Sequence, residues 1–92
     1  MKLERTKRFK QDYKREAKGR HRNTLDESFI VVLKSLLENK PLAEKYKDHA
    51  LTGDWSDHRD CHIKPDLVLI YRKPNKKVLQ LVRIGSHGEL GL

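Results

Sequence analysis

The chain has 92 residues, a net charge of +8 at neutral pH and a single cysteine, Cys61. A chain of this length is expected to form one domain, residues 1–92, because it cannot build two hydrophobic cores. One cysteine excludes an intrachain disulfide, and no apolar run reaches the roughly 20 residues that span a bilayer, so we expect a cytoplasmic protein with no membrane partner.

The first half of the chain predicts a short strand and two helices. Residues 2–4 can form the strand. Residues 6–19 predict a helix that begins at a capping threonine and stops at a glycine, because apolar residues recur at every fourth position. A second helix is expected to begin at Thr24 or the residue before it, where Thr24 and Glu27 fit a capping box, and to end at residues 39–41. We expect the two helices to form an antiparallel hairpin.

The second half predicts strands separated by turns. Residues 55–63 alternate in polarity, and residues 67–71 form a dense apolar and β-branched run that we expect to be the central strand. Residues 77–84 predict the next strand, with turns at residues 64–66 and 73–76. Two helices followed by such a meander predict an α+β fold, in which the helical hairpin packs on one face of a small antiparallel sheet and leaves the other face open.

Alternation along residues 55–63 divides the side chains between the two faces of the sheet. His58, Asp60 and His62 share one face. The opposite and more apolar set, expected to face the helices, is Trp55, Arg59, Cys61 and Ile63. His62 is therefore expected on the open face, beside the turn that carries Asp66. We interpret Trp55 and Tyr71 as core residues rather than as platforms for base stacking.

The charge distribution favours a nucleic-acid partner. Residues 1–22 and 72–83 are rich in Lys and Arg, and the second of these segments contains no acid. Residues 41–66 are mixed in charge and carry most of the histidines. This pattern suits a site that binds a phosphate backbone at its edges, although a lysine-rich surface alone would give the same net charge.

Histidine is the residue type that could carry chemistry here, because its ordinary pKa allows it both to take and to give a proton near neutrality. RNA supplies its own nucleophile, the 2′-hydroxyl, so histidines, an aspartate and a cation would suffice for cleavage without a metal. The candidates on this ground are His49, His62 and His87, whereas His21 and His58 are interpreted as ordinary surface histidines.

A zinc site is the competing constellation. Three histidines and a cysteine have the right ligand chemistry, namely His58, Cys61, His62 and His87. Cys61 and His62 are adjacent, however, so on a strand they point to opposite faces, and the chain has no Cys-x-x-Cys pair. We therefore expect no metal and no cofactor.

Four segments of the second half resemble, in the same order, the motifs of the YafQ branch of the RelE-like toxins. They are YKDHALTGDW at 46–55, RDCHIKPD at 59–66, LIY at 69–71 and RIGSH at 83–87. These toxins are ribosome-dependent messenger-RNA endonucleases with a RelE-like α+β fold. The resemblance implies that this chain is an endoribonuclease toxin of a type II toxin–antitoxin system that inhibits translation.

The resemblance also implies residue roles. The catalytic residues it implies are His49, His62, Asp66 and His87. His49 would be the base toward the 2′-hydroxyl and His87 the acid toward the leaving oxygen, although these two labels could be exchanged. His62 and Asp66 would orient and support them. The predicted RNA contacts are Arg83, Arg59, Lys47 and Lys64. Members of the family place an aromatic residue after the last histidine, and residues 88–92 contain none.

The partners that the resemblance implies are a cognate antitoxin, the ribosome and messenger RNA, with operator DNA bound only indirectly through the antitoxin. Two alternatives stay open at this point. The chain could be a non-catalytic basic module that binds RNA, or a protein that binds an antitoxin and has lost its RNase activity.

Overall fold

The structure is a computed structural model that describes residues 1–19 and 21–92, and for Thr24 and Asp26 only the backbone. Its centre is a five-stranded sheet in the order β1-β5-β4-β3-β2. The strands are β1 (Lys2–Arg5), β2 (His49–Ala50), β3 (Arg59–Lys64), β4 (Leu67–Asn75) and β5 (Val78–Gly85). The helices are α1 (Lys7–Ala17), α2 (Arg22–Asp26), α3 (Ser28–Leu37) and α4 (His87–Leu90), with 3₁₀ turns η1 (Glu44–Tyr46) and η2 (Gly53–Trp55).

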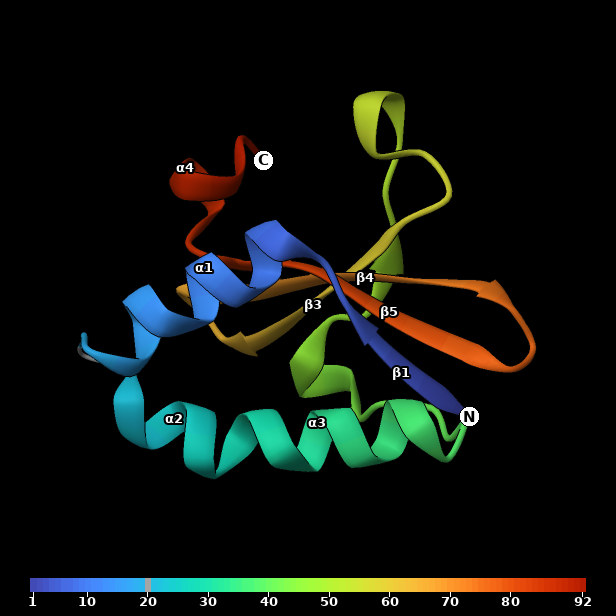
Figure 1. Ribbon diagram of the computed structural model, residues 1–92, viewed down its shortest axis with the longest axis horizontal. Helices are drawn as coiled ribbons and strands as arrows, with labels where there is room; N and C mark the ends of the chain where they lie inside the picture. The colour runs from blue at the N-terminus through green and yellow to red at the C-terminus, as the bar shows by residue number, and fades with distance from the viewer. Residues whose placement is uncertain (20) are drawn as a thin grey trace.

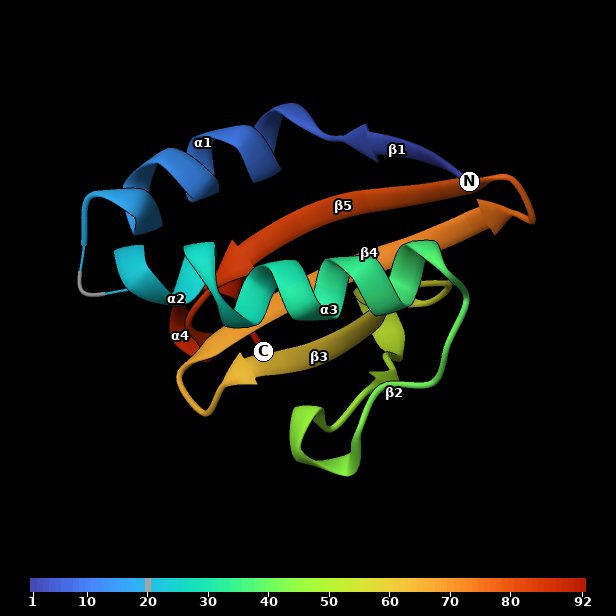
Figure 2. The ribbon, with the colours of Figure 1, turned by 90° about the horizontal axis from the view of Figure 1, so that it is seen from below.

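The predicted α+β class is confirmed, but the sheet is mixed rather than purely antiparallel. β1 pairs with β5 in parallel, Lys2 opposite Val78, whereas the other neighbouring strands are antiparallel. Figure 2 shows β1 along the outer edge of β5. Local patterns identify hairpins between successive strands, and β1 has no neighbouring strand in sequence from which this pairing could be inferred.

The central strand is β4, as predicted. It has a partner on each side, and residues 67–71 are buried throughout. Toward the helices, Leu69 and Tyr71 pack in one core with Phe29 and Val32 of α3. Figure 1 shows α2 and α3 on this side of the sheet and α4 on the other.

The face opposite α3 is not left open, contrary to the prediction. A second, smaller apolar cluster covers part of it, formed by Val68, Ile70 and Leu90 with the half-buried Leu51, Trp55 and Val82. Figure 1 shows the yellow-green loop that contains η2 rising on the same side as α4. The cluster leaves uncovered a part of this face that lies among β2, β3 and α4.

Helix α1 protects the end of β5 that β1 does not reach. Its predicted cap is confirmed, because Thr6 Oγ1 accepts a hydrogen bond from the Phe9 amide at 3.0 Å. Further along, Asp12 accepts from the Ile84 amide at 3.2 Å, and Arg15 donates to the Ile84 carbonyl at 3.2 Å. Side chains of α1 therefore satisfy a backbone edge that would otherwise be open to pairing.

The second predicted helix is divided into α2 and α3, and it begins earlier than expected. The His21 carbonyl accepts from the Leu25 amide at 3.0 Å, so the first turn forms before Thr24. Glu27, between the two helices, has φ −114° and ψ −78° and makes no side-chain cap. The predicted capping box therefore does not start this helix, and the side chain of Thr24 lies outside the described residues.

Two strand boundaries also differ from the prediction. β3 begins at Arg59 because η2 and Asp57, whose φ is +68°, turn the chain just before it. As a result Trp55 lies on the face opposite α3, whereas Cys61 and Ile63 face α3 as predicted. β4 continues past Pro74 to Asn75. The register shifts between Arg72 and Asn75, so the missing amide hydrogen of Pro74 breaks no hydrogen bond between β4 and β5. No helix in the described part of the chain is long and apolar enough to cross a membrane.

Candidate active site

Three of the predicted histidines meet on the face opposite α3. They come from the edge strand β2, from β3 and from the start of α4. The ring centroids of His49 and His62 are 6.4 Å apart, and those of His62 and His87 are 4.9 Å apart in an edge-on arrangement. Antiparallel pairing of β2 with β3 places His49 opposite Asp60, which explains why residues so distant in sequence converge.

A buried carboxylate lies beneath the histidines. Asp60 is only 2% exposed, and its Oδ1 is 3.1 Å from Nδ1 of His49 but has no hydrogen-bond partner among the described residues. Burial raises the pKa of Asp60, and the charges of His49, His62 and His87 oppose that rise. The sequence placed Asp60 on the same face as His62 but did not identify it as a site residue. The signal that could have identified Asp60 is its position two residues before His62, because side chains two apart on a strand share a face.

The backbone before His49 determines the hydrogen-bonding role of one nitrogen of the imidazole ring. His49 Nδ1 lies 2.7 Å from the carbonyl oxygen of Lys47. Lys47 has φ +49° and ψ +45°, a left-handed conformation that costs a non-glycine residue about 1–2 kcal/mol and that directs this carbonyl toward the ring. A carbonyl oxygen only accepts, so in the neutral ring this contact assigns the hydrogen to Nδ1 and the acceptor role to Nε2. Nε2 of His49 is therefore the atom able to act as a base.

His62, the middle histidine, is disposed to stay neutral. Burial lowers its pKa, and the nearby cationic forms of His87, Lys47 and His49 lower it further, while Asp60 acts in the opposite direction. A neutral imidazole has both a donor and an acceptor nitrogen. It can therefore orient a substrate oxygen between the two outer histidines.

The segment that carries His49 is anchored through the opposite side of β3. Asp48 accepts a 2.6 Å hydrogen bond from the hydroxyl of buried Tyr71 and a 3.2 Å bond from Nε of Arg59. Tyr71 is thus a core residue, as predicted. Arg59 lies on the side of β3 that faces α3, with its guanidinium on Asp48, and its contact with RNA stays a prediction. The sequence could not reveal this because Asp48 and Arg59 meet only through the β2–β3 pairing.

Arg83 is also engaged within the protein. It is 9% exposed, and its Nε and Nη2 donate to the two carboxylate oxygens of Asp12 at 2.6 and 3.1 Å. It is not part of a solvated strand face. Contact with an RNA phosphate would require Arg83 to exchange its bonds with Asp12 for bonds with the phosphate.

Asp66 lies in the β3–β4 turn, with its Oδ2 3.5 Å from Nε2 of His21. His21 is buried, at 9% exposed, so the interpretation of it as a surface histidine was wrong. Buried His21 lies at the end of the chain segment that follows α1. This contact therefore joins the helical layer to the turn that follows His62.

Two pockets include site histidines and differ in charge. One, of about 390 Å³, is lined by His62 together with Lys45, Lys47 and Lys64, and it reaches Ser28 at the start of α3. The predicted RNA contacts Lys47 and Lys64 therefore share a cationic pocket with a site histidine. The other pocket, of about 400 Å³, is lined by His49, Asp60 and His87 together with Trp55, and no Lys or Arg in the described part of the chain lines it.

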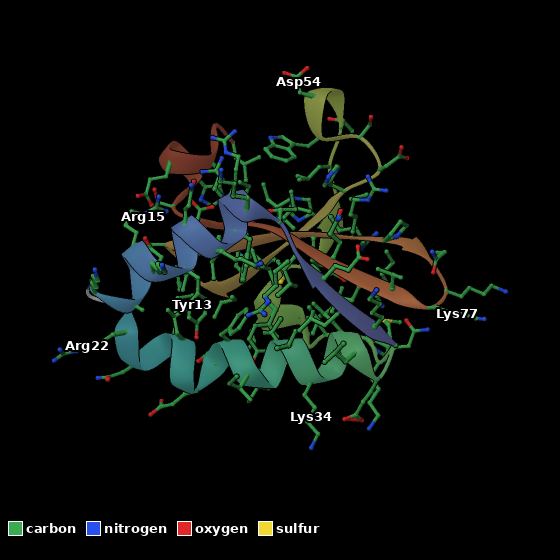
Figure 3. All side chains as sticks on the ribbon, in the orientation of Figure 1. Tyr13, Arg15, Arg22, Lys34, Asp54 and Lys77 are labelled. Atoms are coloured by element: carbon green, nitrogen blue, oxygen red, sulfur yellow. The ribbon has the colours of Figure 1, made fainter. Side chains whose placement is uncertain are left out.

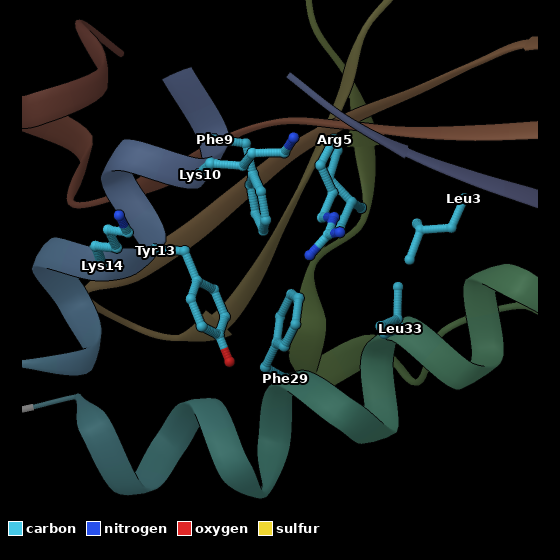
Figure 4. Close-up of a pocket in the computed structure, with 9 residues that line it drawn as sticks. Leu3, Arg5, Phe9, Lys10, Tyr13, Lys14, Phe29 and Leu33 are labelled. Atoms are coloured by element: carbon cyan, nitrogen blue, oxygen red, sulfur yellow. The ribbon is translucent and has the colours of Figure 1, made fainter. Parts of the chain in front are cut away.

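A third hollow lies away from the histidines, between α1 and α3. This groove of about 510 Å³ has a floor of Phe9, Phe29, Leu33 and other apolar side chains. Figure 4 shows Arg5, Lys10 and Lys14 around the same groove. It is an apolar depression with a basic rim.

The alternative zinc site is not assembled. Cys61 is fully buried among the residues that face α3, whereas His62 lies on the opposite face. Within residues 1–19 and 21–92, no group of three His, Cys, Asp or Glu side chains is placed to hold a metal ion.

A sequence model described as "Bacterial toxin of type II toxin-antitoxin system, YafQ" matches residues 1–91. The chain belongs to this family. A YafQ toxin from Haemophilus influenzae is 36% identical over the whole chain and 93% of its own length. The mRNA interferase toxin YafQ of Escherichia coli K12 is also 36% identical, over 96% of this chain and 97% of the relative. Its name agrees with the class of enzyme expected from the sequence.

Solved YafQ structures have the same fold. The crystal structure of YafQ from E. coli BL21(DE3) matches with a TM-score of 0.84 and 32% identity, covering 96% of this chain and 94% of that one. The E. coli DinJ–YafQ complex matches with a TM-score of 0.80 and 34% identity, with the same coverage. The resemblance to YafQ toxins and the RelE-like fold are therefore confirmed.

Proposed function

We propose that this YafQ-family chain is a ribosome-dependent endoribonuclease that cleaves messenger RNA by histidine acid–base chemistry and so inhibits translation in the cytoplasm. The observation that carries the proposal is the cluster of His49, His62 and His87 around buried Asp60. Membership of the YafQ family supports the substrate, because the E. coli relatives are named mRNA interferases.

The geometry supports a two-proton mechanism that needs no metal. Nε2 of His49 takes the proton of a ribose 2′-hydroxyl, and that oxygen attacks the adjacent phosphorus. The bond from phosphorus to the 5′-oxygen breaks, and His87 gives its proton to that oxygen. The products are a 2′,3′-cyclic phosphate and a free 5′-hydroxyl.

The remaining groups support these two histidines. The carboxylate of Asp60 stabilises the cation that forms on His49, and neutral His62 holds the reacting phosphate between the two outer rings. Lys47 and Lys64 bind the RNA backbone beside His62. Asp66 supports the end of β3 from the following turn.

A growth assay tests the catalytic assignment. Induction of the wild-type chain should arrest growth, and His49→Ala, His62→Ala and His87→Ala should each relieve the arrest while circular dichroism shows a folded protein. Lys34→Ala is the control, because Lys34 points outward from α3 on the side of the molecule opposite to the loop with Asp54 (Figure 3). Full toxicity of all three histidine variants would contradict the mechanism. A harmless wild type would favour a non-catalytic binding module.

We further propose that a cognate acidic antitoxin inhibits the chain and connects it to operator DNA. The solved E. coli complex of DinJ with YafQ supports a protein partner of this kind. The groove between α1 and α3 offers an apolar floor for an amphipathic segment, and its rim of Arg5, Lys10 and Lys14 complements acidic side chains.

Charge reversal tests this docking site. Lys10→Glu/Lys14→Glu should weaken binding of the purified antitoxin, measured by calorimetry, and should make the effect of salt on binding smaller. Lys76→Glu/Lys77→Glu is the matched control, because it reverses the same charge at the distant β4–β5 turn, where Figure 3 places Lys77. Equal weakening by both pairs would show attraction to net charge rather than docking in the groove.

A further inference from the structure

We propose that Trp55 forms the floor of a base-binding pocket, in which one nucleobase next to the cleaved bond stacks on the indole ring. The proposal rests on the RNase function given above and assigns a role to the pocket of about 400 Å³ beside the histidines. Trp55 shares that pocket with His49, His87 and Leu92. A base held there would lie directly beside the atoms that transfer protons.

The backbone places Trp55 at this pocket rather than in the main core. Residues with left-handed φ precede and follow it, Gly53 at +66° and Asp57 at +68°. The chain consequently turns before β3 begins, and Trp55 ends η2 on the histidine face. A tryptophan in a strand at this position would instead have faced α3.

The indole has the surroundings of a stacking platform. Trp55 packs against the small cluster of Val68, Ile70 and Leu90, yet it is only half-buried and lines the pocket with its exposed part. The ring of His58 packs against the indole, with centroids 5.3 Å apart and an interplanar angle of 79°. A ring that is fixed on one side and exposed on the other can accept a base at little entropic cost.

Charge separates this pocket from its neighbour. Among the described residues its lining includes the carboxylates of Asp54 and Asp60 and no Lys or Arg, so it repels a phosphate and accommodates an uncharged base. The other pocket, which His62 lines, has three lysines and suits the phosphate backbone. A nucleotide chain can therefore place its phosphates at the lysine-lined pocket and one base at the pocket of Trp55.

Trp55→Leu tests the proposal, because leucine keeps an apolar contact with the cluster but cannot stack. The purified variants are assayed for cleavage of messenger RNA on programmed ribosomes. Stacking is worth a factor of about 5 to 150 per base, and we expect kcat/KM to fall within that range, chiefly through KM. Trp55→Phe should stay within a few-fold of the wild type. The pH profile should be the same for all three proteins, because Trp55 moves no proton.

Fluorescence gives a second readout that does not depend on activity. Trp55 is the one tryptophan of the chain, so emission reports on this pocket alone. In the inactive His87→Ala variant, a six-nucleotide single-stranded RNA should quench the emission in a saturable way. Binding of that RNA without quenching would overturn the proposal, as would a Trp55→Leu variant with wild-type KM and melting temperature. If the wild type fails to cleave, the RNase function itself is wrong, whereas an active wild type with an equally active Trp55→Leu variant refutes stacking alone.

Discussion

Replacement of Asp12 by alanine should greatly destabilise the fold, because Asp12 is the buried counter-ion of Arg83. Asp12 is 3% exposed, and its carboxylate accepts two bonds from Arg83, one from the Ile84 amide and one from Arg15. Among the described residues, Asp12→Ala leaves a buried guanidinium without its counter-ion and an amide without its acceptor. A buried charge or amide that has lost its partner costs more free energy than the same group costs when it is paired.

The magnitude follows from this geometry. Breaking one side of a buried ion pair costs about 3–5 kcal/mol. We expect the lower end, about 3 kcal/mol, because Arg15 beside the pair is half-exposed. For a domain of this size that loss lowers the melting temperature by more than about 10 °C. It is a large share of a total stability of about 5–15 kcal/mol.

Urea unfolding followed by circular dichroism measures the effect. Arg83→Met and the double variant Asp12→Ala/Arg83→Met complete a cycle, and the double variant should lose less free energy of unfolding than the sum of the two single variants. Glu38→Gln, in the exposed pair with Lys40, is the control and should change nothing measurable. A loss below about 1 kcal/mol for Asp12→Ala would refute the reasoning and would mean that Arg83 can turn to solvent, where RNA could reach it.

The same pair predicts how stability depends on pH. Burial alone would raise the pKa of Asp12, but bonds from Arg83 and the Ile84 amide, with the charges of Arg83 and Arg15, lower it below its ordinary value of 3.8. The ionised form therefore stabilises the fold above that value, and the contribution is lost as the pH falls through the lower folded pKa. The difference between the wild type and Asp12→Ala should be constant from pH 8 to about 5 and should shrink below about pH 4.

Three further predictions concern the site and the core. Asp60→Asn should abolish cleavage yet stabilise the fold at pH 8 by about 1 kcal/mol or more, because it removes a buried charge whose Oδ1 has no hydrogen-bond partner among the described residues. Thermal melts and the ribosome assay check the two effects, and a less stable variant would contradict this view. Cys61 should resist iodoacetamide in the folded protein and react once urea unfolds it, because the thiol is buried and burial raises its pKa. Rapid labelling under native conditions would be inconsistent with the core described above. Gly85→Ala should reduce cleavage several-fold with little loss of stability, because the Arg15–Glu89 ion pair holds α4 and with it His87. A Cβ at residue 85 would lie 2.9 Å from Nη2 of Arg15 and 3.2 Å from Oε1 of Glu89 and would displace that pair. Unchanged kinetics would show that this contact does not position His87.

Local sequence patterns were sufficient for the features that depend on local rules. The dense apolar run in β4 identified the central strand, and alternation along β3 correctly placed His62 opposite Cys61. The order of the motifs then gave the family and, through it, the three histidines that the structure brings together.

The features missed by the sequence depend on contacts between distant residues. The parallel pairing of β1 with β5 and the bonds from Asp12 to Arg83 join opposite ends of the chain, and neither leaves a periodic signal. Arg83 therefore resembled an exposed cation. Trp55 was assigned to the wrong face because the left-handed residue between it and β3 shifts the alternation, and aspartate at that position gives no strong sign of such a turn.

The central claim is that the RNA's own 2′-hydroxyl is the nucleophile and that His49 activates it. The most direct measurement places a single 2′-deoxynucleotide on the 5′ side of the cleaved bond in a ribosome-bound messenger RNA. We predict that the wild-type chain cuts the all-ribose RNA to a 2′,3′-cyclic phosphate and leaves the substituted RNA intact at that bond. Equal cleavage of both RNAs would contradict the account, because another nucleophile would then have to attack the phosphorus.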